Sequence, residues 1–319
     1  MVVPPMTSLR KLGSSSLQVF PLALGGNVFG WTADEAQSFA VLDAYAAAGG
    51  NFIDTADAYS AWVPGNEGGE SETLIGKWLA ARGNRSDIVV ATKVGAHPAY
   101  KGLSATTIKA AAEESLRRLG TDHIDLYYTH FDDETVPVEE IITALDQLVK
   151  DGKVREIAAS NISPQRLRAS LDFSEREGLA RYVALQPHYN LVSRDTYEGE
   201  LQDTAAAAGL AAVPYFALAS GFLTGKYRPG AAVESARAGS AATHLDSERG
   251  QKVLAALDKV AQERDAEIAT VALAWLAARP TVAAPIASAR TVEQLPALVA
   301  VAELRLTDQE LADLTEASA

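Results

Sequence analysis

The stretches Ile88-Val-Val-Ala-Thr-Lys93 and Ile124-Asp-Leu-Tyr-Tyr-Thr-His130 enclose one amphipathic helical pattern, and together they decide the fold. Both are mostly apolar without strict alternation, which is typical of strands buried on both faces of a parallel sheet. Between them, Ser104 is placed to cap a helix that reaches Leu119 and stops at Gly120. The sequence therefore predicts a strand–helix–strand unit with parallel strands.

The same alternation of strand and helix patterns continues on both sides of this unit. Further short apolar runs predict strands at 22–25, 51–54, 154–160, 182–186, 210–215 and 281–285. The helical spacing of apolar residues predicts helices after Asp34, over 71–81, over 138–150, from Pro164, over 268–278 and over 292–302. Eight strands alternating with helices predict an α/β fold, a (β/α)₈ barrel in which residues 1–319 form one domain.

Two segments are predicted to lie outside the repeating unit. The stretches 9–12 and 17–20, separated by Gly13-Ser-Ser-Ser16, predict a β-hairpin that covers the barrel floor. The segment 227–243 is rich in Gly, Ala, Ser and Arg, and this composition predicts a mobile loop.

The composition excludes several classes of function. The 319 residues include no cysteine, which rules out disulfides, thiolate catalysis and zinc–thiolate sites. A formal net charge of -13 argues against nucleic-acid and anionic-membrane partners, and the spacing of the histidines predicts no metal site. The first ten residues lack the apolar run of a secretory signal, and the apolar stretch 269–278 is too short to span a bilayer. We therefore expect a cytoplasmic protein, whose oligomeric state the sequence leaves open.

Four polar residues that suit carbonyl chemistry stand at or just after the carboxyl ends of three predicted strands. Asp54 and Tyr59 belong to Asn51-Phe-Ile-Asp-Thr-Ala-Asp-Ala-Tyr59, while Lys93 and His130 follow the next two strands. Barrel enzymes build their active sites at this end of the strands. Each residue alone has an ordinary structural reading, in a turn, a packed loop, a surface or a cap. Together they suit a proton donor, because lysine favours tyrosinate, aspartate keeps the lysine charged and histidine polarises a substrate oxygen.

These segments and several later ones resemble the aldo-keto reductase superfamily over nearly the whole chain. Phe52-Ile-Asp-Thr-Ala-Asp-Ala-Tyr59 resembles its Asp/Tyr signature, Ala91-Thr-Lys-Val94 its lysine strand and Asp125-Leu-Tyr-Tyr-Thr-His130 its histidine strand. Further matches follow in the family's order at Ala158-Ala-Ser-Asn161, Leu185-Gln-Pro-His-Tyr-Asn190, Val213-Pro-Tyr215 and Gly221-Phe-Leu-Thr-Gly-Lys-Tyr227. The segments are most similar in style to bacterial reductases that share features with potassium-channel β subunits.

The resemblance implies an NADPH-dependent oxidoreductase that reduces an aldehyde or ketone to an alcohol. Tyr59 would protonate the carbonyl oxygen, and Lys93 would lower the pKa of Tyr59. Asp54 would pair with Lys93, and His130 would orient the carbonyl group. A small-molecule carbonyl compound is therefore the expected binding partner.

The resemblance also implies a dinucleotide site of the barrel type, because the chain has neither a Rossmann Gly-x-Gly-x-x-Gly nor P-loop spacing. The nicotinamide carboxamide would be held by three polar side chains, Ser160, Asn161 and Gln186. Tyr215 would stack on the nicotinamide ring. The implied cofactor-binding set is Gly26, Asn27, Asp54, Ser160, Asn161, Gln186, Tyr215, Phe216, Leu218, Ser220, Gly221, Leu223, Gly225, Lys226, Ile286, Ser288, Arg290 and Gln294.

The segment implied to bind the adenosine 2′-phosphate carries Ser288 and Arg290 at the start of a predicted helix, which favours NADPH over NADH. At several positions around the implied cofactor site, the residues of this chain differ from those of many family members. Phe216 and Ala217 stand where Ser-Pro is frequent, Ser288 replaces a common glycine, and Leu298 takes the place of a frequent asparagine. These departures predict an altered affinity for the cofactor.

Trp31, Trp62 and His130 are the candidate substrate-pocket residues, and Trp62 belongs to the segment 60–69, which is longer than the matching turn of many relatives. Two alternatives to a simple carbonyl reductase remain open. One is an NADPH-binding regulatory subunit that acts through partners with slow turnover, and the other is a reductase of a nucleotide sugar or natural-product ketone. The complete set of four polar residues favours an enzyme, although the sequence identifies neither the substrate nor the preferred direction.

Overall fold

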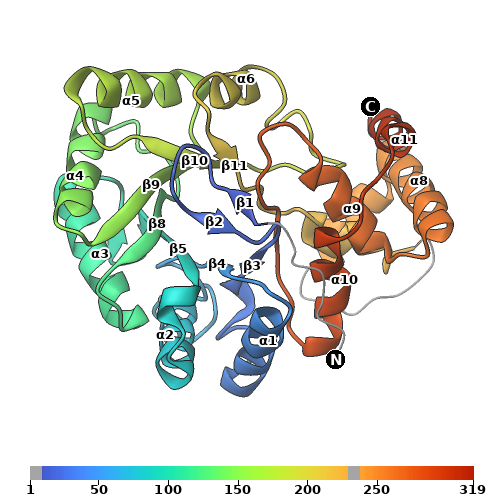
Figure 1. Ribbon diagram of the computed structural model, residues 1–319, viewed down its shortest axis with the longest axis horizontal. Helices are drawn as coiled ribbons and strands as arrows, with labels where there is room; N and C mark the ends of the chain where they lie inside the picture. The colour runs from blue at the N-terminus through green and yellow to red at the C-terminus, as the bar shows by residue number, and fades with distance from the viewer. Residues whose placement is uncertain (1–8, 229–237) are drawn as a thin grey trace.

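The computed structural model describes residues 9–228 and 238–319, in which eight strands curl into a parallel barrel (Figure 1). Neighbours follow the order β11-β10-β9-β8-β5-β4-β3-β12. Their bounds are β3 (Ala23–Gly25), β4 (Phe52–Asp54), β5 (Val89–Val94), β8 (Ile124–Thr129), β9 (Val154–Ser160), β10 (Tyr182–Gln186), β11 (Ala211–Ala212) and β12 (Ile286–Ala287). Backbone hydrogen bonds close the barrel, because Ala212 donates to Thr281 at 2.8 Å and accepts from Ala283 at 2.9 Å. The predicted (β/α)₈ barrel is confirmed.

Helices surround the strands, and several begin at the predicted caps. The side chain of Ser104 accepts from the backbone of Thr107, and Asp34 and Gln37 form a reciprocal capping box. The helices are α1 (Glu35–Ala47), α2 (Glu70–Arg82), α3 (Ala105–Leu119), α4 (Val138–Lys150), α5 (Pro164–Glu177), α6 (Glu200–Ala207), α7 (Ala238–Leu245), α8 (Glu248–Arg264), α9 (Ile268–Ala277), α10 (Leu295–Val299) and α11 (Asp308–Ala317). Short 3₁₀ segments include η1 (Gly26–Val28), η3 (Ala219–Thr224), η4 (Val292–Gln294) and η5 (Ala300–Ala302).

The predicted hairpin forms and seals the barrel floor. Strands β1 (Arg10–Lys11) and β2 (Gln18–Val19) pair antiparallel, and Leu12, Leu17 and Val19 are buried in the apolar interior of the barrel. At Gly13, φ is +57°, and an added Cβ would lie 2.1 Å from the carbonyl oxygen of Val183, near the start of β10. The turn therefore fits against the amino-terminal end of the strands, which leaves their carboxyl ends open to a site.

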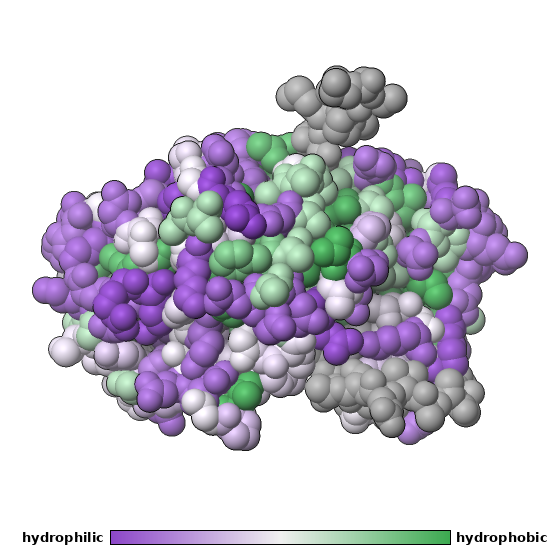
Figure 2. Space-filling model, turned by 90° about the horizontal axis from the view of Figure 1, so that it is seen from below, coloured by the Kyte–Doolittle hydropathy of each residue, from purple (hydrophilic) through white to green (hydrophobic). Residues whose placement is uncertain are grey.

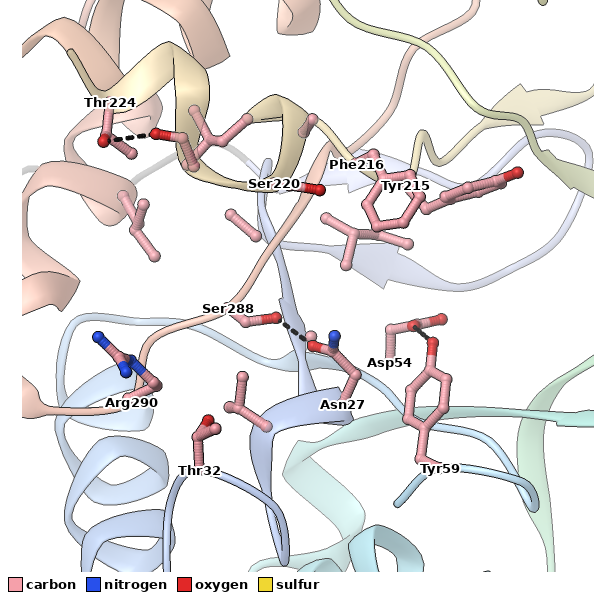
Figure 3. A pocket seen from close by; sticks show the side chains of 18 of the residues that line it. Asn27, Thr32, Asp54, Tyr59, Tyr215, Phe216, Ser220, Thr224, Ser288 and Arg290 are labelled. Carbon is pink, nitrogen blue, oxygen red and sulfur yellow. Dashed lines mark hydrogen bonds between the residues drawn. The ribbon is translucent and has the colours of Figure 1, made fainter. Parts of the chain in front are cut away.

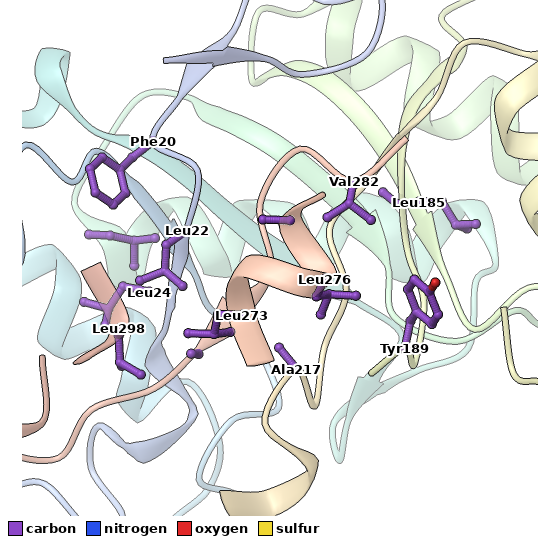
Figure 4. Close-up of a cluster of buried hydrophobic side chains, with 14 of the residues drawn as sticks. Phe20, Leu22, Leu24, Leu185, Tyr189, Ala217, Leu273, Leu276, Val282 and Leu298 are labelled. Carbon is purple, nitrogen blue, oxygen red and sulfur yellow. The ribbon is translucent and has the colours of Figure 1, made fainter. Parts of the chain in front are cut away.

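A second apolar layer lies between the strands and the helices. Figure 4 shows part of it, where Leu24 of β3, Leu273 of α9 and Leu298 of α10 are drawn together. Each of the three side chains is nearly or fully buried. Leu298 therefore contributes to the core, which gives a packing reason for an apolar residue at this position.

The last strand and the last predicted barrel helix differ from expectation. Residues 281–283 meet Ala212 at the barrel seam, and the strand that pairs with β3 is β12, not 281–285. Pro285 has no N–H to donate, but the seam continues past it, because Ile286 donates to the carbonyl oxygen of Pro214 at 2.9 Å. The helix predicted over 292–302 is divided into η4, α10 and η5, with Pro296 in the first turn of α10.

Four helices were not predicted: α6, α7, α8 and α11. Helix α7 begins at Ala238, so the loop predicted over 227–243 is wrong for its last residues, where alanines favour a helix. Residues 229–237 of that prediction lie outside the described residues. Within the described part of the chain, no helix is both long and apolar enough to cross a membrane.

Candidate active site

Three of the four polar residues join in one hydrogen-bonded group at the carboxyl ends of β4 and β5. The Nζ of Lys93 donates to Asp54 Oδ2 at 2.8 Å, to Tyr59 Oη at 2.9 Å and to the carbonyl oxygen of Thr55 at 2.8 Å. Tyr59 Oη donates to Asp54 Oδ2 at 3.3 Å. The ring of His130, just after β8, lies 6.1 Å from the Tyr59 ring. All three ammonium hydrogens of Lys93 thus have acceptors, as a charged lysine requires.

The pKa of Tyr59 is raised overall, and the expected lowering of this pKa by Lys93 stays a prediction. Burial raises the pKa of Tyr59 well above its ordinary value, and the charge and hydrogen bond of Asp54 raise it further. Burial also lowers the pKa of Lys93, an effect that the charge of Asp54 opposes. Tyr59 therefore keeps its proton in the resting protein. The hydrogen bond from Lys93 is already in place to stabilise negative charge that develops on the tyrosine oxygen.

His130 is a neutral group at this site. Burial, together with the charge of Lys93, lowers the pKa of His130 to about 3. Its ring stacks on Phe131 with centroids 4.8 Å apart, and its carbonyl oxygen accepts from Asn161 Nδ2 at 2.8 Å. Within the described residues, Nδ1 of His130 has no hydrogen-bond partner. A neutral imidazole held in this way can donate one hydrogen bond to a substrate oxygen.

A pocket of about 630 Å³ opens above the carboxyl ends of the strands, within the size range of ligand pockets, about 300–1,000 Å³. It extends from Asp54 and Tyr59, past Asn27, to Ser288 and Arg290 (Figure 3). The other lining residues are Gly25, Val28, Trp31, Thr32, Trp62, His130, Phe131, Ser160, Asn161, Gln186, Tyr215, Phe216, Ala217, Leu218, Ser220, Gly221, Thr224, Lys226, Glu267, Ala269, Ile286, Ala287, Gln294, Ala297 and Leu298.

The residues implied to hold a nicotinamide lie next to the hydrogen-bonded group of Lys93, Asp54 and Tyr59. Gln186 Nε2 donates to Asp54 Oδ1 at 2.8 Å, which ties the end of β10 to the end of β4. Tyr215 Oη donates to Asn161 Oδ1 at 2.8 Å, and Asn161 adopts a left-handed φ of 47°. This wall combines amide and hydroxyl groups with an oriented aromatic ring, as a planar carboxamide-bearing ring requires.

The far end of the pocket combines an unusual backbone with positive charge. Ala219, Ser220 and Gly221 have φ values of 46°, 56° and 93°, and consecutive left-handed residues are uncommon outside glycine. Such conformations are found at ligand clamps. A Cβ on Gly221 would lie 3.4 Å from Nζ of Lys226, so that the lysine packs along this segment. Arg290 adds a second cation to the same end of the pocket.

Ser288 fits this chain because of a compensating glycine. Its Oγ donates to Asn27 Oδ1 at 2.7 Å. A Cβ on Gly25 would lie only 2.5 Å from Ser288 Oγ. The serine that replaces a common glycine thus occupies space that Gly25 leaves open, and it orients the amide of Asn27 in the pocket wall.

Most of the predicted site residues line the pocket, but four do not. Lys93 is fully buried behind Tyr59, and Leu223 is buried in the core. Gly225 packs on Ile268, while Gly26 lies against Ser71. Wall residues that the sequence did not indicate include Phe131, Thr32, Thr224 and Glu267. The only sequence signal for Phe131 was its position directly after His130.

The pocket is also where exposed apolar side chains gather. The side of the barrel that Figure 2 shows is a different face, on which hydrophilic residues surround apolar residues near the centre. Among the described residues, the large hydrophobic side chains that remain exposed are Leu9, Trp62, Phe131, Phe216 and Val292. Three of these five, Trp62, Phe131 and Phe216, line the pocket. Exposed aromatic groups concentrated at a cavity indicate an apolar ligand.

Comparison with known proteins identifies the family. The family model described as "Aldo/keto reductase family" matches residues 21–319. The uncharacterized oxidoreductase YrpG of Bacillus subtilis is 36% identical over 311 residues, which cover 94% of this chain and 92% of that protein. The norsolorinic acid reductase stcV of Emericella nidulans is 32% identical over 319 residues, covering 95% and 79%. The NADP⁺ aryl-alcohol dehydrogenase of Phanerodontia chrysosporium is 31% identical over 326 residues, covering 94% and 83%. The chain therefore belongs to the aldo/keto reductase family.

Proposed function

We propose that this chain is an NADPH-dependent oxidoreductase that reduces an aldehyde or ketone to an alcohol, with Tyr59 as the proton donor. The observation that carries the proposal is the hydrogen-bonded group of Lys93, Asp54 and Tyr59, which opens beside a neutral His130 into a ligand-sized pocket. The complete group favours catalysis over a role in binding alone.

The side chains have distinct tasks in this reaction. His130 donates a hydrogen bond to the substrate oxygen and holds the carbonyl beside Tyr59. Tyr59 gives its proton to the oxygen as negative charge develops there. Lys93 stabilises the resulting tyrosinate through its 2.9 Å contact, and Asp54 keeps the ammonium group in place. A bound nicotinamide supplies the hydride that reduces the carbonyl carbon.

The polar and charged residues of the pocket fit a dinucleotide. Ser160, Asn161 and Gln186 would hold the carboxamide of the nicotinamide, and Tyr215 would cover its ring. Arg290 would bind the 2′-phosphate by charge-assisted hydrogen bonds, which supports NADPH over NADH. The NADP⁺-dependent relative from Phanerodontia chrysosporium supports the same choice of cofactor.

An aromatic carbonyl compound is the substrate class that the aromatic walls favour. Trp31 and Trp62 meet edge to face at 5.6 Å, and Tyr59 lies 6.2 Å from Trp62. Phe131 is 52% exposed beside His130. Flat aromatic substrates gain both buried area and ring contacts from such walls. The names of the two relatives, an aryl-alcohol dehydrogenase and a norsolorinic acid reductase, support this class.

Tyr59→Phe tests the proposal because it removes one hydroxyl and leaves the ring. We expect NADPH binding, followed by nicotinamide fluorescence, to persist while reduction of aryl aldehydes falls by at least about 100-fold. Tyr100→Phe is the matched control, since it removes a tyrosine hydroxyl outside the pocket. Unchanged carbonyl reduction in a Tyr59→Phe preparation that binds NADPH would refute the assignment. Binding without turnover by the wild-type protein would favour the regulatory alternative.

A further inference from the structure

A buried carboxyl group without a hydrogen-bond partner lies behind the catalytic lysine. Asp57 is fully buried, and neither of its carboxyl oxygens has a hydrogen-bond partner within the described residues. Its backbone N–H donates to the carbonyl oxygen of Lys93 at 3.3 Å, so the turn after β4 is held against β5. Buried carboxylates normally bind a cation or several N–H groups, so Asp57 requires an explanation.

Besides Lys93, the cation whose charge acts on Asp57 is Arg118, and it is already bound to another carboxylate. Glu72 of α2 is fully buried, accepts from Thr92 Oγ1 at 2.5 Å and accepts from Arg118 Nε of α3 at 2.6 Å. The hydroxyl of Tyr127 on β8 is buried and has no hydrogen-bond partner among residues 9–228 and 238–319, and the charge of Asp57 acts on it. On the outer side, Arg118 lies 3.9 Å from Glu114.

The charges of this region do not balance when all three carboxyl groups are ionised. Asp54, Asp57 and Glu72 are then three anions, and Lys93 and Arg118 are two cations. The neighbouring His97 adds no charge because burial lowers its pKa, so the buried group would carry a net charge of minus one. An uncompensated charge is unfavourable in the protein interior, and one bound proton removes it. Within the part of the chain that the structure describes, Asp57 is the one of these three carboxyl groups that neither pairs with a cation nor accepts a well-formed hydrogen bond.

We propose that Asp57 is a positioning residue that holds this proton in the resting protein and, through Lys93, sets the pH range in which Tyr59 donates its proton. The second half of this inference rests on the proposed carbonyl reduction. The first half concerns the protonation of one buried carboxyl group and holds whether or not the chain is a reductase.

The electrostatic surroundings support both halves. The pKa of Asp57 is raised to about 8, first by burial and next by the charge of Glu72, while the charges of Arg118 and Lys93 and the nearby N–H of Ala58 act in the opposite direction. Asp57 and Glu72 in turn raise the pKa of Lys93. When Asp57 loses its proton, its negative charge weakens the electrostatic stabilisation that the Lys93 ammonium group gives to negative charge on the Tyr59 oxygen. Tyr59 then retains its proton to higher pH, which extends proton donation into the alkaline range.

The stability of Asp57→Asn against pH tests the bound proton. An ordinary pKa of 3.8 in the unfolded chain and about 8 in the folded protein means that the folded state binds more protons between these values. The bound proton therefore stabilises the folded wild-type protein fully at pH values below this window, and this contribution to the free energy of unfolding is lost as the pH rises through it. Asparagine mimics the neutral acid, so we expect Asp57→Asn to gain stability relative to wild type across the window. Asp172 on α5 is exposed, and Asp172→Asn serves as the control. If the stability difference between Asp57→Asn and wild type does not change with pH, Asp57 does not hold a proton in the folded protein.

An infrared measurement on the wild-type protein covers the case in which Asp57→Asn does not fold. Protein labelled with isotopic aspartate should show a protonated aspartic-acid carbonyl band at neutral pH that disappears near pH 8. The label separates this band from that of Glu156, whose pKa is also raised by burial. Absence of a labelled protonated band at neutral pH would overturn the proposal.

The pH profile of carbonyl reduction tests the action through Lys93. In Asp57→Asn the extra charge cannot appear, so we expect the alkaline limb of kcat to shift to lower pH by on the order of one unit, with KM for the substrate little changed. Asp172→Asn should retain the wild-type profile. An unchanged profile in a folded, active Asp57→Asn protein would refute the positioning role. If the wild-type protein does not reduce carbonyl compounds, the proposed function fails. The stability and infrared results still decide whether Asp57 holds a proton.

Discussion

Replacing Lys93 with methionine removes the central cation of the site, and the structure gives the size of the effect. The Lys93 side chain is 0% exposed and that of Asp54 is 2% exposed, so the substitution leaves a buried carboxylate without its counter-charge. Loss of one partner of a buried ion pair costs about 3–5 kcal/mol. For a chain of 319 residues this corresponds to a fall in Tm of about 4–8 °C. Carbonyl reduction should fall by at least about 100-fold, because Tyr59 loses the group that stabilises its anion.

The double variant Lys93→Met with Asp54→Asn separates stability from catalysis. It removes both charges, and the amide introduced in place of the carboxylate leaves no buried ion behind. We expect it to recover most of the lost stability in urea and thermal unfolding while remaining inactive, with a double-mutant cycle giving the coupling energy. A loss below about 1 kcal/mol in the single variant, or a double variant no more stable than the single one, would refute the view of Lys93 and Asp54 as a mutually dependent buried pair.

Three further predictions concern the two ends of the pocket and its histidine. Arg290→Ala should weaken NADPH binding by about 10–100-fold and change the affinity for NADH by no more than about 2-fold, as measured by nicotinamide fluorescence. Arg176 is exposed, and Arg176→Ala should change neither affinity. Equal losses of affinity for both nucleotides would contradict a 2′-phosphate contact. Trp62→Ala should raise KM for an aryl aldehyde by about 5-fold with kcat little changed, whereas an aliphatic aldehyde responding equally would argue against an aromatic contact. The pKa of His130 is about 3 in the folded protein against 6.5 in the unfolded chain, so the unfolded state binds more protons in this window. The free energy of unfolding should therefore fall as the pH drops through this window, and His130→Gln should remove about 5 kcal/mol of that dependence in urea unfolding.

The sequence was a good guide wherever a segment lies within one repeating unit of the barrel. The strand from Val154 to Ser160 and the helix from Val138 to Lys150 were predicted with their observed bounds, because apolar spacing and capping residues act locally. The end of the barrel was predicted less well. Residues 281–287 divide their backbone bonds between Ala212 on one side and β3 on the other. That division depends on how the curved sheet closes, which no local pattern records.

The candidate site shows the same limit. The positions of Asp54, Lys93 and His130 at strand ends predicted that these residues would meet, since all parallel strands end on one side of the barrel. The pKa of Tyr59 was not predictable, because it depends on burial and on Asp54, which together raise it despite the hydrogen bond from Lys93. Pocket residues such as Glu267 enter from helices that follow the long segment after Lys226, where sequence pattern does not fix the path of the chain.

The hairpin on the barrel floor has a consequence for folding. Arg10 donates through its NH1 nitrogen to the carbonyl oxygens of Ala277 at 2.8 Å, Val282 at 3.2 Å and Ala283 at 3.3 Å. These bonds join segments 267 to 273 residues apart, at the seam where Ala212 also meets Ala283. Contacts between such distant segments form late, because a long loop must close first. We therefore expect closure of the ring to be the last step, so that a chain still lacking residues 281–287 exposes unpaired edges at β3 and β11 and is the species most prone to aggregate.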